Sequence, residues 1–523
     1  MENPDIFIKE KVQDATSSIG DSLALPDEYI EGCSERGLEK QAEAYETVKR
    51  VCRVIHEAGG RALLVGGAVR DLLLHLDADI KDFDIEVYNL DLETLEDLLR
   101  PLGKMSGVGK SFAVHKLFLD NGVDIDISLP RRDSKTGSRH GDFSVDADPY
   151  MSISEAARRR DFTINAILAD PLTGQIFDPF HGVEDLKQKT LRIVDAETFV
   201  DDPLRILRAM QFVGRFDLVV DRQSQELMSS MSDSLRHLSK ERIYEEWRKL
   251  LLKSIRPSSG LQLGMDVGVF KALHPDFVTL TDTPQDPEKH PEGTVWEHTK
   301  LIVDNMADVA RREQLNDAEM WPLMLAALCH DLGKAKTTTE RDGKIIAHGH
   351  DIASVSLTHN FLDSMTDDKF VRSHVLPLVQ HHMRPMHLFR DKLHSQEIKD
   401  SVFRRLARDL SPANIRELAF LSEADAKASL ESNEEQIRTL VEWLVVKAES
   451  LGVDRQAAPE LMSGKDFLSL GYTPGPEIGR LIQLSSQLRD VRGFSREDII
   501  QNLFNIKTSI DAIGVLEKLL IQD

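Results

Sequence analysis

The order of hydrophobic and polar residues divides the chain at about residue 185. Before this point, short apolar runs and strict alternation predict strands, and amphipathic stretches between them predict helices. The predicted strands are 61–65, 82–88, 112–119 and 123–129, and the predicted helices are 41–58, 68–76 and 92–102. Beyond residue 185 the helical period dominates. The pattern therefore predicts an α+β head with a mixed sheet, followed by a mostly all-α neck, body and tail.

Proline-containing breaks divide the helical part further. They lie near Pro257, at Pro284–Pro291, near Pro412 and at Pro474–Pro476, and proline is a strong signal for the end of a helix. We expect five parts, which are a helical extension (1–44), a head (45–190), a neck (191–280), a body (281–450) and a tail (451–523).

Composition indicates a cytoplasmic protein. The 523 residues are 41% hydrophobic and 29% charged, which is ordinary for a globular protein. No run approaches the roughly 18 apolar residues of a membrane span, and the first residues lack a signal-peptide pattern. Cys33, Cys52 and Cys329 are far apart, which excludes a disulfide scaffold and fits a reducing compartment. No sequence feature indicates an oligomeric state.

The net charge restricts the nucleic acids that the chain could bind. With 88 acidic and 65 basic residues the formal charge is −23, which excludes a general DNA coat. A local basic surface could still bind one nucleic acid. Candidates are Arg131, Arg132, Lys135 and Arg139 in one group and Arg158–Arg160 in another, although each could equally be a solvated loop.

The first candidate site is a pair of carboxylates in the predicted strand 82–88. Asp82 and Asp84 are two residues apart, so both point to one face of the strand. The strand after the next predicted turn offers Asp124 and Asp126, again on one face. Mg²⁺ prefers oxygen ligands and keeps substrate phosphates in its shell. Three such carboxylates suit two metal ions about 4 Å apart in a phosphoryl-transfer site.

A glycine pair upstream makes this interpretation more specific than an isolated D-x-D, which is usually just solvated. Gly66 and Gly67 lie between a predicted strand and a predicted helix, where backbone N–H groups can approach a phosphate. Arg70, one turn into the helix, could pair with a triphosphate. This succession of a strand, a glycine pair, a helix and a D-x-D motif predicts a site for a nucleoside triphosphate.

These segments resemble a known family. VGGAVRDLLL (65–74) and KDFDIEV (81–87) resemble the signature of class II tRNA nucleotidyltransferases, the CCA-adding enzymes, and of bacterial poly(A) polymerases in the polymerase β superfamily. Further similar motifs follow in the family's order at 158–166, 178–192, 201–209 and 239–243. Asp201 stands where the family has Glu. The resemblance covers about residues 60–510 and implies a polymerase β-like nucleotidyltransferase head.

The resemblance implies roles for particular residues. Asp82 and Asp84 would bind catalytic Mg²⁺, with Asp126 as the third carboxylate and Asp124 as its alternative. The implied nucleotide-binding residues are Gly66, Gly67, Arg70, Arg159, Arg160, Asp161, Asn165, Asp202, Arg205 and Arg208.

Base selection would fall to the motif at 201–209. Asp202, Arg205 and Arg208 are spaced three residues apart, which places them on one stripe of a helix. In the family, the Asp and the Arg of this motif pair with the edge of the incoming base. Cytosine and adenine both offer an amine for Asp202 and an acceptor for Arg205. The resemblance therefore implies tRNA, CTP and ATP as partners, and the alternative is a salt-bridged structural helix.

A second constellation lies in the body. His330 and Asp331 end an apolar helix in LAALCHDLGK (325–334), and the order H…HD…H…H…D resembles the HD phosphohydrolase superfamily. This resemblance implies a site for Ni²⁺, Mn²⁺, Fe²⁺, Co²⁺ or Mg²⁺. One metal could use His298, His330, Asp331 and Asp425, and a second could use His350 with His381 or His382. The choice between His348 and His350 also stays open.

The leading interpretation is a template-independent enzyme that adds CCA to tRNA by a two-metal mechanism and carries an HD domain with a candidate phosphohydrolase activity. A poly(A) polymerase and a CC-only or A-only enzyme are alternatives within the superfamily, and a flexible loop at 131–149 would govern the change from CTP to ATP. The alternative from another class is an HD phosphohydrolase with an RNA-binding head. Intact Asp82, Asp84 and Arg70 argue against that alternative.

Overall fold

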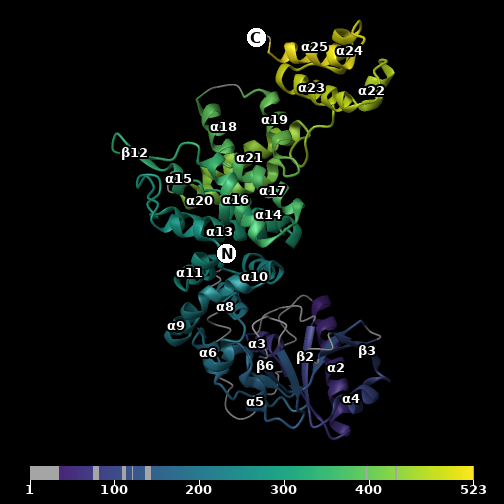
Figure 1. Ribbon diagram of the computed structural model, residues 1–523, viewed down its shortest axis with the longest axis vertical. Helices are drawn as coiled ribbons and strands as arrows, with labels where there is room; N and C mark the ends of the chain where they lie inside the picture. Colours follow the sequence, from purple (N-terminus) through teal and green to yellow (C-terminus); the bar gives the residue numbers. More distant parts are fainter. Residues whose placement is uncertain are drawn as a thin grey trace. The chain divides into compact units, whose positions relative to one another are not determined.

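The computed structural model describes residues 35–74, 82–108, 114–119, 122–135, 143–394, 398–429 and 433–521. They form two compact units, coloured along the chain in Figure 1. The first contains the residues up to Leu238 together with Asp266–Val269, and the second contains Ser239–Met265 and the residues from Phe270 onward. The division between the units falls inside the predicted neck.

The first unit is built on a mixed seven-stranded sheet in the order β3-β4-β5-β2-β1-β8-β9. Its strands are β1 (Arg61–Val65), β2 (Asp82–Tyr88), β3 (Gly103–Val108), β4 (Val114–Leu119), β5 (Asp124–Ser128), β8 (Leu168–Ala169) and β9 (Ile176–Phe177). Strands β2 and β5 are parallel, and the other pairs of this sheet are antiparallel. The predicted mixed sheet is confirmed, and it makes the two D-x-D strands direct neighbours.

Helices surround this sheet and continue into the predicted neck. They are α2 (Glu35–Glu57), α3 (Gly67–Leu73), α4 (Leu92–Leu99), α5 (Ile153–Arg158), η2 (Thr163–Asn165), α6 (Gly182–Lys187), α7 (Ala196–Phe199), α8 (Leu204–Phe216), α9 (Arg222–Met231) and η3 (Ser232–His237), with the strand pair β10 (Thr190–Leu191) and β11 (Val219–Val220). Helix α2 packs against β1 and α4 (Figure 1). It buries Val48, Val51, Cys52 and Ile55, and it begins ten residues before the boundary predicted at residues 44 and 45.

The segment predicted as a flexible loop, 131–149, contains regular structure. Strands β6 (Arg131–Lys135) and β7 (Phe143–Ala147) pair in antiparallel register. Residues 136–142 between them, including Arg139 of the first predicted basic group, lie outside the described residues, as does the side chain of Lys135.

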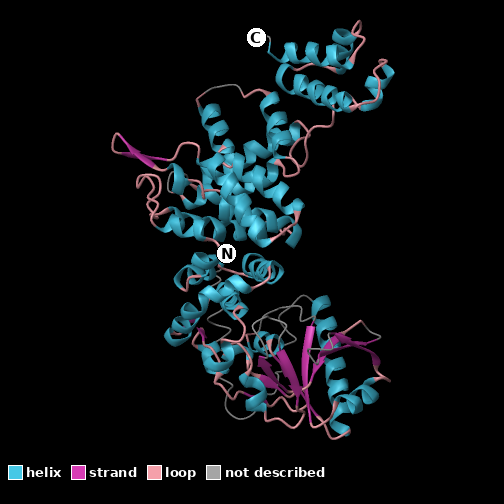
Figure 2. Ribbon diagram, viewed as in Figure 1, coloured by secondary structure: helices cyan, strands magenta, loops and turns pink. Residues whose placement is uncertain are grey.

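The second unit is helical except for one hairpin (Figure 2). Its elements are α10 (Lys240–Lys253), α11 (Pro257–Asp266), α12 (Val269–Leu273), η4 (Pro275–Thr281), α13 (Val295–Arg312), α14 (Asp317–Cys329), α15 (Lys334–Thr337), β12 (Thr339–Arg341), β13 (Lys344–Ile346), α16 (His350–Met365), α17 (Lys369–His381), α18 (Arg384–Leu393), α19 (Asp400–Leu410), α20 (Ile415–Ala428), α21 (Glu434–Ser450), α22 (Gly464–Ser469), α23 (Pro476–Arg492), α24 (Arg496–Leu503) and α25 (Ser509–Ile521). The mostly all-α neck, body and tail are thereby confirmed.

Helix α14 lies at the centre of the HD region. It starts with a capping box between Asn316 and Glu319, and its residues from Met320 to Cys329 are all buried. A helix that is apolar all round belongs in a protein core, and α14 packs against α10, α13, α16, α17 and α20. The packing brings the ends of several helices, and the histidines on them, to one point.

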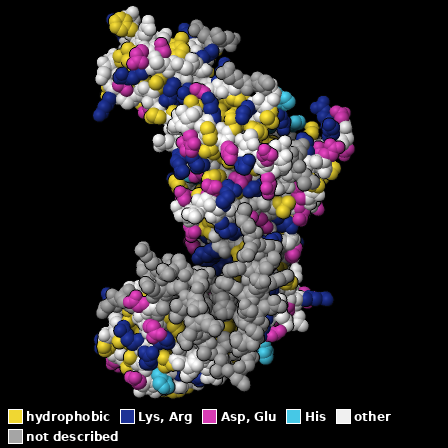
Figure 3. All heavy atoms as spheres, turned by 180° about the vertical axis from the view of Figure 1, so that it is seen from behind, with side chains coloured by type: hydrophobic (Ala, Val, Ile, Leu, Met, Phe, Trp, Pro, Cys, Tyr) yellow, Lys and Arg dark blue, Asp and Glu magenta, His cyan; other side chains and the backbone are white. Residues whose placement is uncertain are grey.

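The last four helices share a core of their own around Phe467, Leu481, Leu488 and Leu516. Among the helices of the described residues, none has the length and apolar character needed to cross a membrane. On the face drawn in Figure 3, basic and acidic side chains of the described helices are interspersed.

Candidate functional site

The carboxylates of the two D-x-D strands lie side by side in the sheet. In the parallel pair β2–β5, Asp84 is in register with Asp126 and Asp82 with Asp124. The alternate residues of both strands, such as Ile85 and Ile127, are buried, so the aspartates occupy the opposite face. Asp84 is exposed, and the side chain of Asp82 lies outside the described atoms. The register thus brings the predicted catalytic acids together.

A lysine that sequence reasoning missed lies next to these acids. Lys116 on β4 is opposite Asp126 in the antiparallel pair β4–β5. Its Nζ atom lies 3.3 Å from Oδ1 of Asp126. Asp126 is therefore held by an ion pair with the residue opposite it. The residue opposite Asp124 in the same strand pair is Phe118, which has no charge.

The glycine pair lies against the acidic face. Gly66 has a φ of 70° and precedes the first residue of α3. A Cβ atom at this position would lie 3.3 Å from Nη1 of Arg160 and 3.8 Å from Oδ2 of Asp84. Positive φ favours glycine because it has no Cβ. The predicted turn, the D-x-D strand and the arginine motif therefore meet at one place.

Arg70 points into the protein. Its side chain is 4% exposed, and it donates hydrogen bonds from Nη1 to Oδ1 of Asn165 at 2.6 Å and from Nε to Asp71 at 2.8 Å. The guanidinium also lies 4.5 Å from the centre of the Phe216 ring. Burial lowers the pKa of Arg70. The predicted contact with a triphosphate stays a prediction, and within the protein Arg70 contacts Asn165, Asp71 and the Phe216 ring.

Asp161 joins the motif at 158–166 to helix α8. Its carboxylate accepts hydrogen bonds from the backbone N–H of Phe162 at 2.8 Å, from Nδ2 of Asn165 at 2.9 Å and from Nε of Arg208 at 2.6 Å. Burial opposes ionisation, but Arg208 and Asn165 hold the pKa of Asp161 below its usual value. The network fixes Asn165, which in turn accepts from Arg70.

The base-selection motif differs from the prediction at one residue. Helix α8 begins at Leu204 after Pro203, so Asp202 precedes the helix and does not share a helical stripe with Arg205 and Arg208. Its Oδ1 atom accepts the N–H of Leu204 at 3.1 Å. Arg205 donates from Nη2 to the carbonyl oxygen of Arg159 at 2.6 Å, which ties α8 to the arginine motif.

A buried carboxylate that sequence reasoning missed directs two of the three arginines inward. Glu86 has a fully buried side chain and accepts from Tyr88 Oη at 2.6 Å and from Arg159 Nη2 at 3.0 Å. Arg160 Nη2 lies 3.7 Å from the same carboxylate. Arg158 instead pairs with acidic residues at the surface. The predicted basic surface at 158–160 is thus reduced to Arg158. The signal was present, because Glu86 continues the alternation of Asp82 and Asp84.

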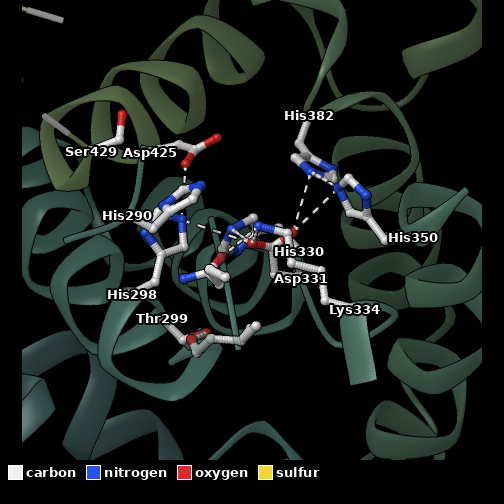
Figure 4. A network of polar contacts seen from close by, with 12 residues as sticks. His290, His298, Thr299, His330, Asp331, Lys334, His350, His382, Asp425 and Ser429 are labelled. Atoms are coloured by element: carbon white, nitrogen blue, oxygen red, sulfur yellow. Dashed lines mark hydrogen bonds and ion pairs between the residues drawn. The ribbon is translucent and has the colours of Figure 1, made fainter. Parts of the chain in front are cut away.

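The HD residues form one cluster in the second unit (Figure 4). His298 comes from α13, His330 and Asp331 follow α14, His350 begins α16, His382 follows α17 and Asp425 lies on α20. His350 and His382, and not their neighbours His348 and His381, belong to the groups of close ligand atoms. The geometry therefore favours one histidine in each of the two alternatives that the sequence left open.

Asp331 lies between two groups of ligands. Its Oδ1 atom is 3.3 Å from Nε2 of His350 and 3.8 Å from Nε2 of His382. Its Oδ2 atom is 3.2 Å from Nε2 of His330 and 3.8 Å from Nε2 of His298. Each oxygen atom of the Asp331 carboxylate thus lies close to two imidazole nitrogens.

A metal ion fits this donor set. Asp425 lies 3.2 Å from His298, and the candidate ligand atoms of His298, His330 and Asp425 all lie within 4.8 Å of one another. His330 Nε2 and Asp331 Oδ1 are buried and form no hydrogen bond within the described residues, although they lie 3.2 Å from Asp331 Oδ2 and 3.3 Å from His350 Nε2, respectively. Buried polar atoms normally have hydrogen-bond partners, and a metal ion between these ligands would satisfy both atoms.

Electrostatics in the cluster favour metal-binding protonation states at Asp331 and His382 but not at His298. Burial opposes ionisation of Asp331, but Lys334 and His330 hold the pKa of this carboxyl well below its usual range. Burial and the neighbouring His330 lower the pKa of His382 to about 4. Neutral imidazoles and ionised carboxylates are the forms that bind metals. Burial disfavours the imidazolium form of His298, but hydrogen bonds with Asp425 and Glu292 raise its pKa to about 9, so this ring must lose a proton when it binds a metal. Lys334, whose Nζ lies 2.7 Å from Asp331 Oδ2, was not predicted as part of the site.

Models of known protein families match segments in both units. The family model of the "Poly A polymerase head domain" matches residues 62–192, that of the "Probable RNA and SrmB- binding site of polymerase A" matches 217–280, and that of the "HD domain" matches 295–428. These define the class as a polymerase head, an RNA-binding segment and an HD domain in that order.

Curated relatives then identify the family. A multifunctional CCA protein of Xanthomonas campestris pv. campestris is 33% identical over 414 residues, which cover 76% of this chain and 94% of the relative. One from Pasteurella multocida is 37% identical over 302 residues, with 56% and 67% covered. The chain belongs to the family of multifunctional CCA proteins, so the resemblance drawn from its motifs is confirmed.

Solved structures support the fold. The Thermotoga maritima CCA-adding enzyme complexed with tRNA has a TM-score of 0.53 at 20% identity and covers 94% of this chain and 97% of its own. The Bacillus stearothermophilus CCA-adding enzyme in complex with CTP has a TM-score of 0.56 at 19% identity, with 86% and 93% covered.

Proposed function

We propose that the protein adds C, C and A to the 3′ end of tRNA from CTP and ATP. The observation that carries this proposal is the register of Asp84 with Asp126 beside the Gly66 turn. Membership of the multifunctional CCA protein family supports it, and so do related structures described in complex with tRNA, CTP and ATP.

In this proposal the carboxylate face holds Mg²⁺. Asp82, Asp84 and Asp126 supply the oxygen ligands, with Asp124 as the alternative third ligand. The bound ions would stabilise the attacking 3′-oxygen and the leaving pyrophosphate. The Gly66–Gly67 turn leaves room for the triphosphate next to Asp84, because neither residue has a side chain that could occupy that space.

The arginine motif and helix α8 would bind the rest of the nucleotide. Arg160 lies near both Glu86 and the Gly66 turn, and Arg159 pairs with Glu86. Their charge would suit a triphosphate. Asp161 and Asn165 fix each other and would orient the ribose. Asp202 and Arg205 would read the base edge, because their donor and acceptor pattern matches cytosine and adenine. Guanine and uracil would leave these groups unpaired.

The test uses the purified protein and tRNA that ends before its CCA. We expect CTP alone to add two residues, ATP alone to add none, and ATP supplied after CTP to add one. Repeated addition from ATP alone would instead identify a poly(A) polymerase. Addition that stops after two C residues even with ATP would identify a CC-only enzyme.

We also propose that the HD cluster binds divalent transition metal and hydrolyses phosphoesters, including phosphorylated or cyclic-phosphate RNA ends. His298, His330, Asp331 and Asp425 would hold one ion, and Asp331, His350 and His382 a second. Two buried ligand atoms, His330 Nε2 and Asp331 Oδ1, form no hydrogen bond within the described residues, and this supports the proposal. Bound metal would lower the pKa of a water ligand and make it a nucleophile. Metal analysis of the purified protein tests the proposal. We expect Ni²⁺, Mn²⁺, Fe²⁺ or Co²⁺, and absence of bound metal together with no phosphoesterase activity on added metal would refute it.

A further inference from the structure

His298 differs from the other histidines of the cluster in what its Nδ1 atom contacts. In His330, His350 and His382, Nδ1 lies 2.9, 2.7 and 2.7 Å from the backbone carbonyl oxygen three residues earlier. In His298, Nδ1 lies 2.7 Å from the Oε1 atom of Glu292. Each contact leaves Nε2 directed at the cluster, but only His298 is oriented by a charged side chain.

Glu292 is placed to hold this ring. It precedes α13, and its side chain is 9% exposed. The same Oε1 atom lies 2.9 Å from Nδ1 of His290, whose side chain is 19% exposed. One carboxylate oxygen of Glu292 thus contacts the rings of both His290 and His298.

A carboxylate that accepts a hydrogen bond from a metal-binding imidazole has two effects. It fixes the ring with one nitrogen protonated, and it makes the other nitrogen a stronger donor to the metal. Backbone carbonyl oxygens also fix the ring, but they carry no full charge. The ligand atom on His298 is Nε2, which lies 3.2 Å from Asp425 and 3.8 Å from Asp331.

We propose that Glu292 is a positioning residue for the metal centre, and that it strengthens the binding of the ion held by His298, His330 and Asp425. The ion held by His350 and His382 would not depend on it, because those rings are fixed by backbone atoms. In this proposal His290, Glu292 and His298, which lie close together, form a hydrogen-bonded chain. This inference rests on the proposed HD metal site.

The first test titrates Mn²⁺ into the metal-free full-length protein by calorimetry. We expect two binding events in the wild type, and one of them weakened about 10–100-fold in Glu292→Gln while the other is unchanged. Glu297→Gln is the matched control, because Glu297 is exposed, lies next to His298 on α13 and pairs with Lys300. Equal affinities in Glu292→Gln and Glu297→Gln would overturn the inference.

The second test does not require metal. In long-range ¹H–¹⁵N spectra of histidine-labelled, metal-free protein, we expect a hydrogen-bonded Nδ1 proton on His298 in the wild type and in Glu297→Gln, and its loss in Glu292→Ala. If the wild type binds no Mn²⁺, the phosphohydrolase proposal fails, and these spectra still decide whether Glu292 orients His298. An unchanged His298 signal in Glu292→Ala would overturn the inference.

Discussion

Replacement of Asp161 by Asn is expected to destabilise the first unit strongly. The Asp161 side chain is 7% exposed, and that of Arg208, its ion-pair partner, is 33% exposed. The introduced amide could still accept from Phe162 and Asn165 through the oxygen in place of Oδ1, but its NH₂ group would then face the Nε–H donor of Arg208. Removal of one charge from a buried, hydrogen-bonded pair costs about 3–5 kcal/mol. Because water reaches part of Arg208, we expect about 3 kcal/mol, the lower end of that range.

The assay is calorimetric unfolding of the full chain, in which we follow the transition of the first unit. For a unit of this size, a loss of about 3 kcal/mol lowers the midpoint by roughly 6–12 °C. Asp217→Asn is the control, because its 48% exposed side chain forms a surface pair with Lys189. Asp217 also has a φ of 52°, which Asn tolerates well. An Asp161→Asn midpoint within 2 °C or so of the Asp217→Asn midpoint would refute the reasoning.

Acid provides a second check on the same residue. The pKa of Asp161 is lower in the folded protein than its usual value, which is about 3.9 in an unfolded chain. A depressed folded pKa contributes stability above the unfolded pKa, and this contribution is lost as the pH falls through the folded pKa. The difference in stability between wild type and Asp161→Asn should therefore be constant near pH 7 and should shrink below about pH 4. A difference that does not shrink in acid would show that the carboxylate charge is not its cause.

Three further changes test the sites separately. Asp84→Ala should abolish nucleotide addition, measured by primer extension, without lowering the unfolding temperature, measured by calorimetry. Near-normal addition would show that Asp84 is not a metal ligand. Asp202→Ala should reduce discrimination against UTP and GTP by roughly tenfold to a hundredfold, since a bidentate contact contributes about 1–3 kcal/mol, and an unchanged nucleotide preference would make the motif structural. The double change His330→Ala with Asp331→Ala should remove bound transition metal and phosphoesterase activity while CCA addition continues, and simultaneous loss of addition would show that the two sites are not independent.

The strands that carry the proposed metal-binding aspartates could be predicted because their patterns are strong. Alternation in 82–88 and 123–129 predicted β2 and β5, but not that they are parallel neighbours, since register depends on the whole sheet. Strand β3 was missed because its sequence, GKMSGV, contains two glycines and few strongly hydrophobic residues. It is a strand because it pairs with β4 along its full length.

The site residues show the same limit. The histidines and Asp331 of the HD cluster could be selected by type and order, but His381 and His382 are adjacent, and only the phase at the end of α17 places His382 in the cluster. Asp202 was placed on a helix because spacing alone ignores Pro203, after which α8 begins. Glu292 precedes its helix and has no periodic signal, and its position against His298 is set only by tertiary packing.

The most direct test of the account is the sequence of the tRNA 3′ ends formed when all four nucleoside triphosphates are supplied together at equal concentration with Mg²⁺. The account predicts that tRNA lacking its terminus is extended by C, C and A and then no further, because the proposed base selection by Asp202 and Arg205 admits only cytosine and adenine. Ends that consist of long A tracts, or that contain U or G as often as C, would contradict it.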